Sequence, residues 1–465
     1  GGRGIRIVET ADQFAGALDE ARNEAERAFG DSSVIVERYV QQPRHVEVQL
    51  IGDKHGRVEH LGTRECSVQR RYQKLFEEAP APNLPDATRD GLHEAAVRLG
   101  AAVGYDSAGT VEFVVDGSTG EFFFLEMNTR LQVEHPVTEE ITGLDLVELM
   151  INVAVGQPLP PELDEVTFTG HACEARIAAE DASQGFMPSI GTIDILEVPA
   201  HVRWDSGVVA GSSITPHFDS MVAKLIVSGN DRPAALAAMR AALDDLLIAG
   251  VTTTTGFHRW LLDQDALVEA TVTTRLLDAI ELPASPDLAT EIAAALWREH
   301  RRGEASNVWS EIGSLSMTPH VHQRSLGLRS DDGEIHEVAD TSGVSAPNSM
   351  RSLIDDSTRR IAINVNGHTQ AFTVVSRTER WAADPTGRSS GGDALVSPFP
   401  AVIAEVRVSP GDELKGGDVA VVIEAMKMLH SVTASGAATV SEVLVAVGDQ
   451  VAGGQELVRL TSENE

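Results

Sequence analysis

An internal repeat near the C-terminus constrains the fold of this 465-residue chain more than any other feature. The run 405–417 (EVRVSPGDELKGG) returns 37 positions later as 442–454 (EVLVAVGDQVAGG). A half of this length cannot bury a hydrophobic face alone, so the two halves are expected to pack against each other. The repeat therefore predicts a flattened β-barrel with a pseudo-twofold axis in the last part of the chain.

The hairpin between the two halves carries Lys427 in a turn that falls at Ala425 to Met428. Turns favour Gly, Asn, Asp or Pro, so Met426 and Met428 are poor structural choices there. The plain interpretation of an arbitrary Met-Lys-Met is a solvated lysine above two packed methionines. In the middle of a duplicated β domain that interpretation is the weaker one, because Glu424-Ala-Met-Lys-Met428 resembles the biotin-attachment motif of biotinyl carrier domains. The resemblance implies that biotin is bound covalently to Lys427.

Two further features bear on this resemblance. Lipoyl domains share the fold but usually set Asp and Ala around their lysine, so a lipoyl-like domain fused to another ATP-grasp ligase fits less well. The upstream run 397–401 departs from the Pro-Met-Pro-Gly that is usual in biotinyl domains. We interpret that departure as drift in a hairpin.

A second set of polar residues alternates along a predicted strand. Residues at i and i+2 share a face of a strand, so Glu126 and Asn128 project together while Leu125 and Met127 are expected to face the core. Glu112 lies on the partner strand of the same predicted hairpin, where its carboxylate can converge on them. Two carboxylates and an amide oxygen suit Mg²⁺, which prefers hard oxygen ligands. A solvated strand face is the plain alternative for Glu126 and Asn128 alone.

The alternation continues through Arg130, Gln132 and Glu134, which a solvated strand face does not explain. The run 122–136 resembles the ATP-grasp domain of biotin carboxylases. Supporting pieces occur in the order of that family, including Glu37-Arg-Tyr-Val and a Gln-Arg-Arg-Tyr-Gln-Lys stretch that ends at Lys74.

The resemblance implies roles for individual residues. The implied catalytic residues are Arg130, Glu134 and Arg176, with Glu134 as the general base on bicarbonate. Bicarbonate would be bound by Lys74, Arg130, Gln132, Val133 and Arg176. The nucleotide would be bound by Gly1, Gly2, Glu37, Arg38, Val40, His45 and Gln69. Mg²⁺ (or Mn²⁺) would be bound by Glu112, Glu126 and Asn128, with ATP as the substrate.

Three other residues invite an assignment that we do not make. Tyr72 stands where the family usually has His or Asn, so no binding role is given to it. Cys66 is expected to be a small buried residue rather than a nucleophile, and His171 a structural histidine. Cys66 and Cys173 are the only cysteines, too few for a disulfide scaffold or a thiolate zinc site.

The fold class implied is a multidomain α+β protein with an ATP-grasp biotin carboxylase region, a small β-rich docking domain and the flattened barrel of a biotinyl domain. Strands are expected at 34–40 and 45–51. The expected division runs along the chain as a remainder of an ATP-grasp lid subdomain at 1–39, the C-terminal ATP-grasp region of a biotin carboxylase at 40–283, a docking domain at 284–381, a flexible linker at 382–393 and a biotinyl carrier domain at 394–465.

The charge balance excludes some classes of partner. The chain has 37 Lys and Arg against 70 Asp and Glu, a formal net charge of −33, which repels nucleic acids and anionic membranes. No apolar run approaches the ~18 residues that a membrane span requires. A reduced, cytoplasmic protein fits these features best.

The whole pattern resembles the α subunit of an acyl-CoA carboxylase of fatty-acid metabolism. This implies ATP- and bicarbonate-dependent carboxylation of biotin on Lys427, a separate carboxyltransferase β subunit in a hetero-oligomer, and a biotin protein ligase. The alternative is a non-catalytic carrier and docking protein with a vestigial ATP-grasp domain. Because the sequence starts after the lysines and first glycines of the family's phosphate loop, we expect residues 1–465 alone to be biotinylated but inactive.

Overall fold

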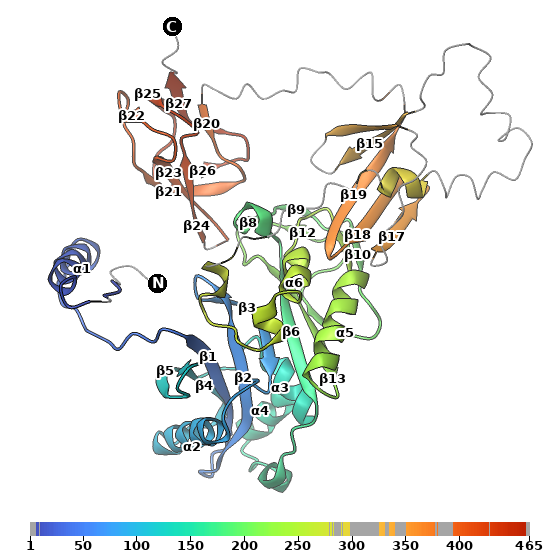
Figure 1. The fold of residues 1–465 in the computed structure, drawn as a ribbon. Coiled ribbons are helices and arrows are strands. Elements are labelled where there is room, and N and C mark those ends of the chain that lie inside the picture. Colours follow the sequence, from blue (N-terminus) through green and yellow to red (C-terminus); the bar gives the residue numbers. More distant parts are fainter. Residues whose placement is uncertain are drawn as a thin grey trace, which may run out of the picture. The chain divides into compact units, whose positions relative to one another are not determined.

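The computed structural model describes residues 6–8, 10–278, 280, 282, 290, 292–297, 325–330, 334–339, 350–376, 379, 394–426 and 428–461 (Figure 1). The chain divides into two compact units. Unit 1 comprises Gly1–Ala175, Ile226–Ala238 and Gln264–Glu281, and unit 2 comprises Arg176–Leu225, Met239–Asp263 and Leu282–Glu465.

Unit 1 is built on antiparallel strands in the order β6-β3-β2-β1-β4-β5 (Figure 1). Their bounds are β1 (Pro43–Gly52), β2 (Val58–Arg70), β3 (Gln73–Ala79), β4 (Ser107–Asp116), β5 (Phe122–Asn128) and β6 (His171–Ala178). Strand β1 lies between β2 and β4 and is almost wholly buried, whereas β5 is an edge strand with mostly exposed side chains. The central strands therefore offer a rigid platform on which polar side chains can be held.

Helices cover both faces of this sheet. The helices and turns of unit 1 are α1 (Phe14–Phe29), α2 (Asp86–Ala102), α3 (His135–Thr142), α4 (Leu146–Ala154), η1 (Pro161–Glu165), α7 (Asp265–Val268) and η3 (Leu276–Asp278). Helix α2 packs Leu92 and Ala96 against Val46 and Val48 on one face of β1. Helix α4 packs on Ile51, whose side chain points to the opposite face because side chains alternate along a strand.

The predicted strand at 45–51 lies inside β1, but the predicted strand at 34–40 does not form. Residues 31–42 are outside any helix or strand, and Ile35 and Val36 are 82% and 73% exposed. Apolar β-propensity alone does not make a strand, since a strand is stabilised by packing and a paired neighbour.

Unit 2 begins within β6 and continues through short elements. These are β7 (Glu180–Asp181), η2 (Ala182–Gln184), β8 (Met187–Pro188), β9 (Gly191–Thr192), β10 (Ile195–Glu197), β11 (Arg203–Ser206), β12 (Ser213–Ile214), β13 (Met221–Gly229), α5 (Arg232–Asp245), β14 (Leu247–Ala249) and α6 (Thr255–Leu261). Strands β6 and β13 and helix α5 each contain a boundary between the units.

The described part of residues 284–381 is rich in β structure, as the sequence predicts. Its antiparallel sheet has the order β16-β15-β19-β18-β17, with β15 (Ser325–Ser330), β16 (Ile335–Ala339), β17 (Met350–Asp355), β18 (Arg360–Val365) and β19 (His368–Val375). Ile292 and Trp297, from the helical residues 292–297, pack against this sheet. The predicted linker 382–393 lies outside the described residues.

The C-terminal repeat folds into two four-stranded sheets, in the orders β20-β27-β25-β22 and β24-β23-β21-β26. The strands are β20 (Ala394–Val396), β21 (Ala401–Val406), β22 (Glu413–Leu414), β23 (Val419–Ala425), β24 (Met428–Thr433), β25 (Ala438–Val443), β26 (Gln450–Val451) and β27 (Glu456–Thr461). The two sheets share one apolar core. This is the flattened two-sheet barrel that the repeat predicts.

Backbone hydrogen bonds between the halves of the barrel come in symmetric pairs. The Gly411 amide donates to the Val440 carbonyl over 2.8 Å, and the Gly448 amide donates to the Ile403 carbonyl over 2.8 Å. Each partner in the second bond lies 37 positions from its counterpart in the first, so the folded barrel has the pseudo-twofold relation that the repeat predicts. Both glycines have positive φ, 97° and 94°, where a side chain would be strained.

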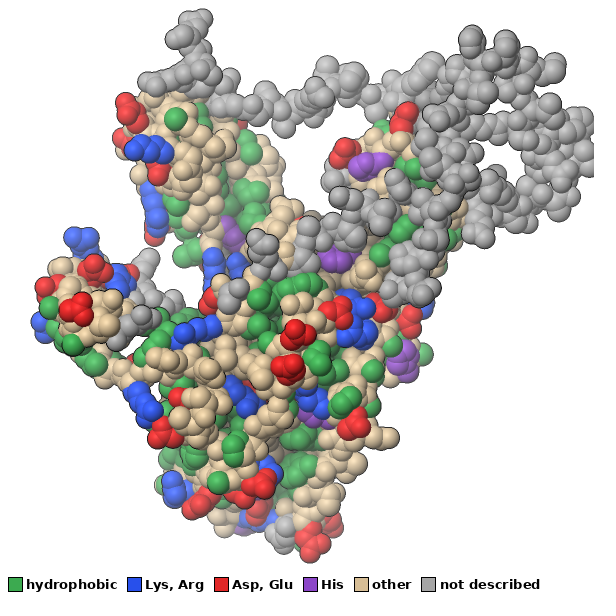
Figure 2. Space-filling view, in the orientation of Figure 1, with side chains coloured by type: hydrophobic (Ala, Val, Ile, Leu, Met, Phe, Trp, Pro, Cys, Tyr) green, Lys and Arg blue, Asp and Glu red, His purple; other side chains and the backbone are tan. Residues whose placement is uncertain are grey.

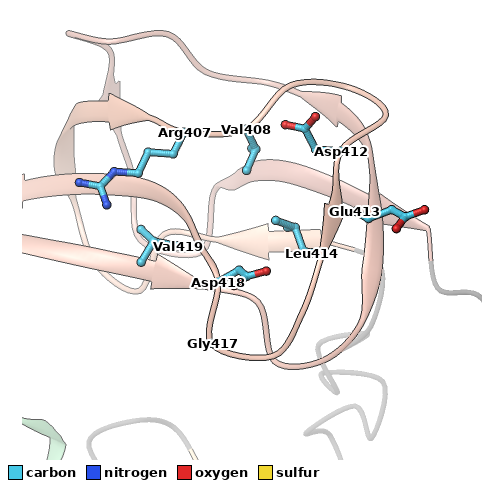
Figure 3. A pocket seen from close by; sticks show the side chains of 8 residues that line it. All are labelled: Arg407, Val408, Asp412, Glu413, Leu414, Gly417, Asp418 and Val419. Carbon is cyan, nitrogen blue, oxygen red and sulfur yellow. The ribbon is translucent and has the colours of Figure 1, made fainter.

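An open pocket of 570 Å³ lies on this barrel (Figure 3). Its lining includes Asp412 and Asp418, whose carboxylates accept the backbone N–H groups of Ser409 and Lys415 over 2.8 and 2.7 Å. Those carboxylates cap the repeated turns, so the pocket is explained by the turn structure.

The charged surface is mixed. Figure 2 shows acidic and basic side chains interspersed on the visible face rather than gathered into one large patch of either sign. No helix within the described ranges is long and apolar enough to cross a membrane.

Candidate functional site

Strand register places a row of charged residues across one face of the unit 1 sheet. Glu47 on β1 pairs with Arg64 on β2 and with Glu112 on β4, and Glu112 pairs in turn with Glu126 on β5. Directly opposite residues in antiparallel strands have Cβ atoms about 5 Å apart. One guanidinium and three carboxylates are therefore held in line by the backbone.

Lys74, on β3, lies at the centre of this charged group. Its Nζ atom is 2.5 Å from Glu47 Oε2, 2.9 Å from Glu112 Oε1 and 2.5 Å from Glu134 Oε1. Arg64 donates from Nε to Glu47 Oε1 over 2.5 Å. The side chains of Glu47, Glu134 and Arg64 are all buried. We call these five residues the ionic cluster.

The charged forms of Glu47, Glu112 and Lys74 are favoured in the ionic cluster. Burial opposes ionisation of Glu47, but the nearby Arg64 and Lys74 outweigh it and lower the pKa of Glu47 to about 2. Burial also opposes ionisation of Glu112, and the hydrogen bond from His45 and the charge of Lys74 lower its pKa to about 2. Burial would favour neutral Lys74, yet the surrounding carboxylates, Glu47 first, raise its pKa.

The three predicted metal ligands converge. Asn128 Nδ2 donates to Glu112 Oε1 over 3.1 Å and to Glu126 Oε1 over 2.9 Å, so one amide group lies between two carboxylates. Rotation of the Asn128 amide by half a turn would point its oxygen into the space between the Glu112 and Glu126 carboxylates. The three side chains would then present three hard oxygen donors to one point. Glu126 is exposed, which leaves the donors open to solvent on one side. The residues present therefore fit Mg²⁺ or Mn²⁺.

The expectation that Leu125 faces the core is wrong. The β4–β5 pairing is irregular between Glu112 and Phe113, which face Glu126 and Phe124, so Leu125 has no partner across the strands. Leu125 is 47% exposed as a result. Such a bulge re-aims side chains locally, and it accompanies the register that brings Glu126 opposite Glu112.

Past Asn128 the strand ends, and the predicted site residues continue in a loop into α3. Arg130 Nη2 donates to Asn128 Oδ1 over 3.3 Å, and Gln132 Nε2 donates to Glu112 Oε1 over 2.8 Å. Val133 is half-buried between them and Glu134, the residue that precedes α3. The loop rather than a strand face brings this run to the ionic cluster.

The residues predicted to bind nucleotide separate into two groups. His45 Nε2 lies 3.1 Å from Glu112 Oε2, and Gln69 Nε2 lies 3.4 Å from His45 Nδ1, so both join the ionic cluster. Glu37, Arg38 and Val40 are instead in the extended segment before β1.

That segment has contacts of its own. Arg38 pairs with Glu121 over 2.9 Å and lies 5.3 Å from the centre of the Phe123 ring. The Val40 carbonyl accepts a bond from Arg275 over 3.2 Å. Gly1 and Gly2 lie outside the described residues.

Arg176 belongs to unit 2, at the point where β6 enters that unit. Its side chain is half-buried, and its carbonyl accepts hydrogen bonds from Thr254 Oγ1 over 3.0 Å and His258 Nε2 over 2.8 Å. These contacts all lie within unit 2.

The hairpin that carries Lys427 is closed by the Ala425–Met428 pair, with Lys427 itself outside the described residues. Met426 in the turn has a φ of 50° and is 4% exposed. Two-residue hairpin turns of this hand favour Asn or Gly, so a methionine is held there at a cost in strain.

The other residues singled out in the sequence fall as follows. Cys66 and Cys173 are fully buried, and burial raises the pKa of both thiols, as expected of unreactive cysteines. His171 Nε2 lies 2.7 Å from Glu78 Oε2, which also pairs with Arg232. Tyr72 is 70% exposed at the tip of the β2–β3 hairpin.

Sequence reasoning missed Glu47 and Arg64. Glu47 stands two residues after His45, so the alternation in β1 could have placed it on the same face. Arg64 carried no comparable signal, because only the register of β1 against β2 shows that it faces Glu47.

Comparisons with known proteins agree along most of the chain. Residues 1–162 match the family model of the carbamoyl-phosphate synthase L chain ATP-binding domain, 174–279 that of the biotin carboxylase C-terminal domain, and 394–460 that of biotin-requiring enzymes. The rice methylcrotonoyl-CoA carboxylase α subunit is 36% identical over 95% of this chain and 69% of its own. The human propionyl-CoA carboxylase α chain is 36% identical over 99% of this chain and 69% of its own.

Solved structures give the same picture for the ATP-grasp part. The Campylobacter jejuni biotin carboxylase complexed with an ATP analogue is 46% identical, with a TM-score of 0.55, over 60% of this chain and 63% of that one. A Hydrogenobacter thermophilus biotin carboxylase domain with MgADP and bicarbonate is 43% identical, with a TM-score of 0.55. The match covers 60% of this chain and 62% of that one. The chain thus spans less than two thirds of those proteins.

Proposed function

The chain belongs to the α subunits of biotin-dependent acyl-CoA carboxylases, and from that premise we propose that it uses ATP and bicarbonate to carboxylate a biotin on Lys427. The observation that carries the proposal is the convergence of Glu112, Glu126 and Asn128 beside Lys74 and Glu134. A vestigial ATP-grasp domain has no need to retain a buried arrangement of this kind.

The first step assigned to these residues is activation of bicarbonate. Glu134 takes the bicarbonate proton, and the resulting oxyanion attacks the terminal phosphate of ATP to give carboxyphosphate and ADP. Lys74 and Arg130 supply positive charge for the anions, and Arg130 offers a two-pronged fork that matches a carbonate plane. Mg²⁺, when bound by Glu112, Glu126 and Asn128, supplies charge neutralisation on the phosphates.

The remaining residues have orienting roles in this proposal. Gln132 Nε2 donates a hydrogen bond of 2.8 Å to the Glu112 carboxylate and so orients it. Val133, in the same loop, contacts the bicarbonate. His45 and Gln69 face the nucleotide, together with Gly1, Gly2 and the segment of Glu37, Arg38 and Val40. Arg176 contacts bicarbonate and biotin.

The proposal extends to partners. The relatives named above are methylcrotonoyl-CoA and propionyl-CoA carboxylase subunits at the same identity, so the acceptor is proposed only as an acyl-CoA. The carboxyl group passes to a separate carboxyltransferase β subunit, with residues 284–381 as the docking domain and 382–393 as a flexible linker. Biotin protein ligase modifies Lys427 in the cytoplasm.

The test is bicarbonate-dependent ATP cleavage in the assembled enzyme. Glu134→Gln should abolish it while leaving nucleotide affinity nearly unchanged, because Glu134 is not among the metal donors. Glu126→Gln, the matched variant, should weaken Mg-ATP binding itself. Near-normal turnover in Glu134→Gln would remove the general-base role. A biotinylated wild-type enzyme without bicarbonate-dependent cleavage would instead support the non-catalytic carrier.

A further inference from the structure

The backbone of Arg176 is fixed by two side chains from a distant segment. Thr254 Oγ1 and His258 Nε2 both donate to the Arg176 carbonyl, over 3.0 and 2.8 Å. Thr254 is also bound to Ala178 twice: its hydroxyl accepts the Ala178 amide over 3.0 Å, and its own amide donates to the Ala178 carbonyl over 3.0 Å. The last residues of β6 are therefore clamped to the start of α6.

His258 is suited to a fixed, neutral role. It is fully buried, and burial lowers its pKa to about 4, so it is neutral at physiological pH. A carbonyl accepts only, so the bond to Arg176 requires the proton on Nε2. Nδ1, a buried acceptor, has no hydrogen-bond partner among the described residues. The ring thus donates in one direction only, toward Arg176.

The element that supplies these side chains is itself held firmly. Thr254 is fully buried, and α6 packs against strand β19 of unit 2. Gly256 lies so close to His368 on β19 that a Cβ atom on Gly256 would come within 2.3 Å of the imidazole ring. The close packing of α6 on β19 therefore fixes where Thr254 and His258 stand relative to β6.

From these contacts we infer that Thr254 and His258 are positioning residues for Arg176. The inference rests on the proposed role of Arg176 in contacting bicarbonate and biotin. A guanidinium orients its ligand through a rigid fork, so a rotation of the Arg176 backbone would move the fork away from its anion. Small displacements of an orienting group are costly in rate even when the fold survives.

The chain offers matched variants at both positions. Thr254→Val removes the hydroxyl at nearly constant shape, whereas Thr254→Ser retains it. His258→Leu removes the donor, whereas the amide nitrogen of His258→Gln can take the place of Nε2. In the biotinylated holoenzyme we expect Thr254→Val and His258→Leu to lower kcat/KM for bicarbonate about tenfold. The KM for ATP should be unchanged, and Thr254→Ser and His258→Gln should recover most of the loss.

A double-mutant cycle with Arg176→Ala separates positioning from general support of the fold. If Thr254 acts through Arg176, Thr254→Val should add no further loss in the Arg176→Ala background. A purely structural clamp would lower the melting temperature of Thr254→Val without changing kcat/KM, and that result would overturn the inference. If Thr254→Val lowered kcat/KM by the same factor in the wild-type and in the Arg176→Ala protein, the inference would be overturned as well.

The same set of variants tells this inference apart from the proposed function. If Arg176→Ala alone leaves kcat/KM for bicarbonate unchanged, the role of Arg176 is wrong and the positioning role falls with it. If Arg176→Ala is defective but Thr254→Val and His258→Leu are not, only the positioning role is wrong.

Discussion

Replacing Lys74 by Met tests whether the ionic cluster is held together by charge. The change keeps the length of the side chain and removes the ammonium group that contacts Glu47, Glu112 and Glu134. The three carboxylates would then lose the cation that they share, although Arg64 would still contact Glu47 and His45 would still lie 3.1 Å from Glu112. Removing one partner of a buried ion pair typically costs about 3–5 kcal/mol, because the remaining charge stays buried without compensation. We expect unit 1 to be destabilised by an amount in that range.

The pH dependence of this loss has a definite sign. In the wild-type protein the pKa values of Glu47 and Glu112 are lowered to about 2, so their stabilisation is present above pH 4.5 and is lost as pH falls toward 2. Without Lys74, repulsion among the carboxylates raises a folded-state pKa above its unfolded value. The folded state then binds more protons than the unfolded state, so the free energy of unfolding of the variant rises as pH falls toward that pKa. The difference in free energy of unfolding between the variant and the wild-type protein should therefore narrow as pH is lowered.

The two cysteines provide a probe that reports on unit 1 alone. Cys66 and Cys173 are the only cysteines of the chain, both lie in unit 1, and both are fully buried. Thiol labelling along a urea gradient therefore follows the unfolding of unit 1. Lys54→Met is the control, because Lys54 is exposed on the same unit and a change there should cost less than about 0.5 kcal/mol. A loss below about 1 kcal/mol for Lys74→Met, or a gap that widens as pH falls, would refute the reasoning.

Three further changes have definite expected outcomes. Glu126→Gln should weaken Mn²⁺ binding about tenfold or more, as measured by electron paramagnetic resonance titration. The control Glu121→Gln, at an exposed site before the same strand, should leave the Mn²⁺ affinity unchanged. Equal Mn²⁺ affinities for the two variants would contradict the metal assignment. Gly256→Ala should cost about 1–3 kcal/mol, because its Cβ meets His368, and a melting temperature equal to wild type would show that the ring can move aside. Lys427→Arg should abolish the streptavidin signal, since a guanidinium does not form the amide, and a retained signal would place biotin elsewhere.

How far the sequence could predict this protein depended on the distance over which the signal acted. The repeat can be read directly from the sequence because its two copies share residues, and the i, i+2 spacing of Glu126 and Asn128 is local; they led to the barrel and to the convergent donors. The prediction that Leu125 faces the core was wrong, because the bulge at this point arises from pairing with β4 and not from the residues of β5 itself. Arg64 and Glu47 are 17 positions apart, and His258 and Arg176 are 82 apart. Nothing in the sequence links the members of these pairs, because they meet only through strand register and tertiary packing.

The symmetric bonds of the C-terminal barrel have a consequence for assembly. Because Gly411 is bound to the second half while Gly448 is bound to the first, the two halves contact each other as the subunits of a twofold dimer would. Nothing in such bonds requires both halves to come from one chain. The first half of one molecule could pair with the second half of another, with the loop around Ser435 and Gly436 as the hinge. The barrel thus has the reciprocal contacts that domain swapping requires, and the length of this hinge governs how easily one chain closes on itself rather than on a second copy.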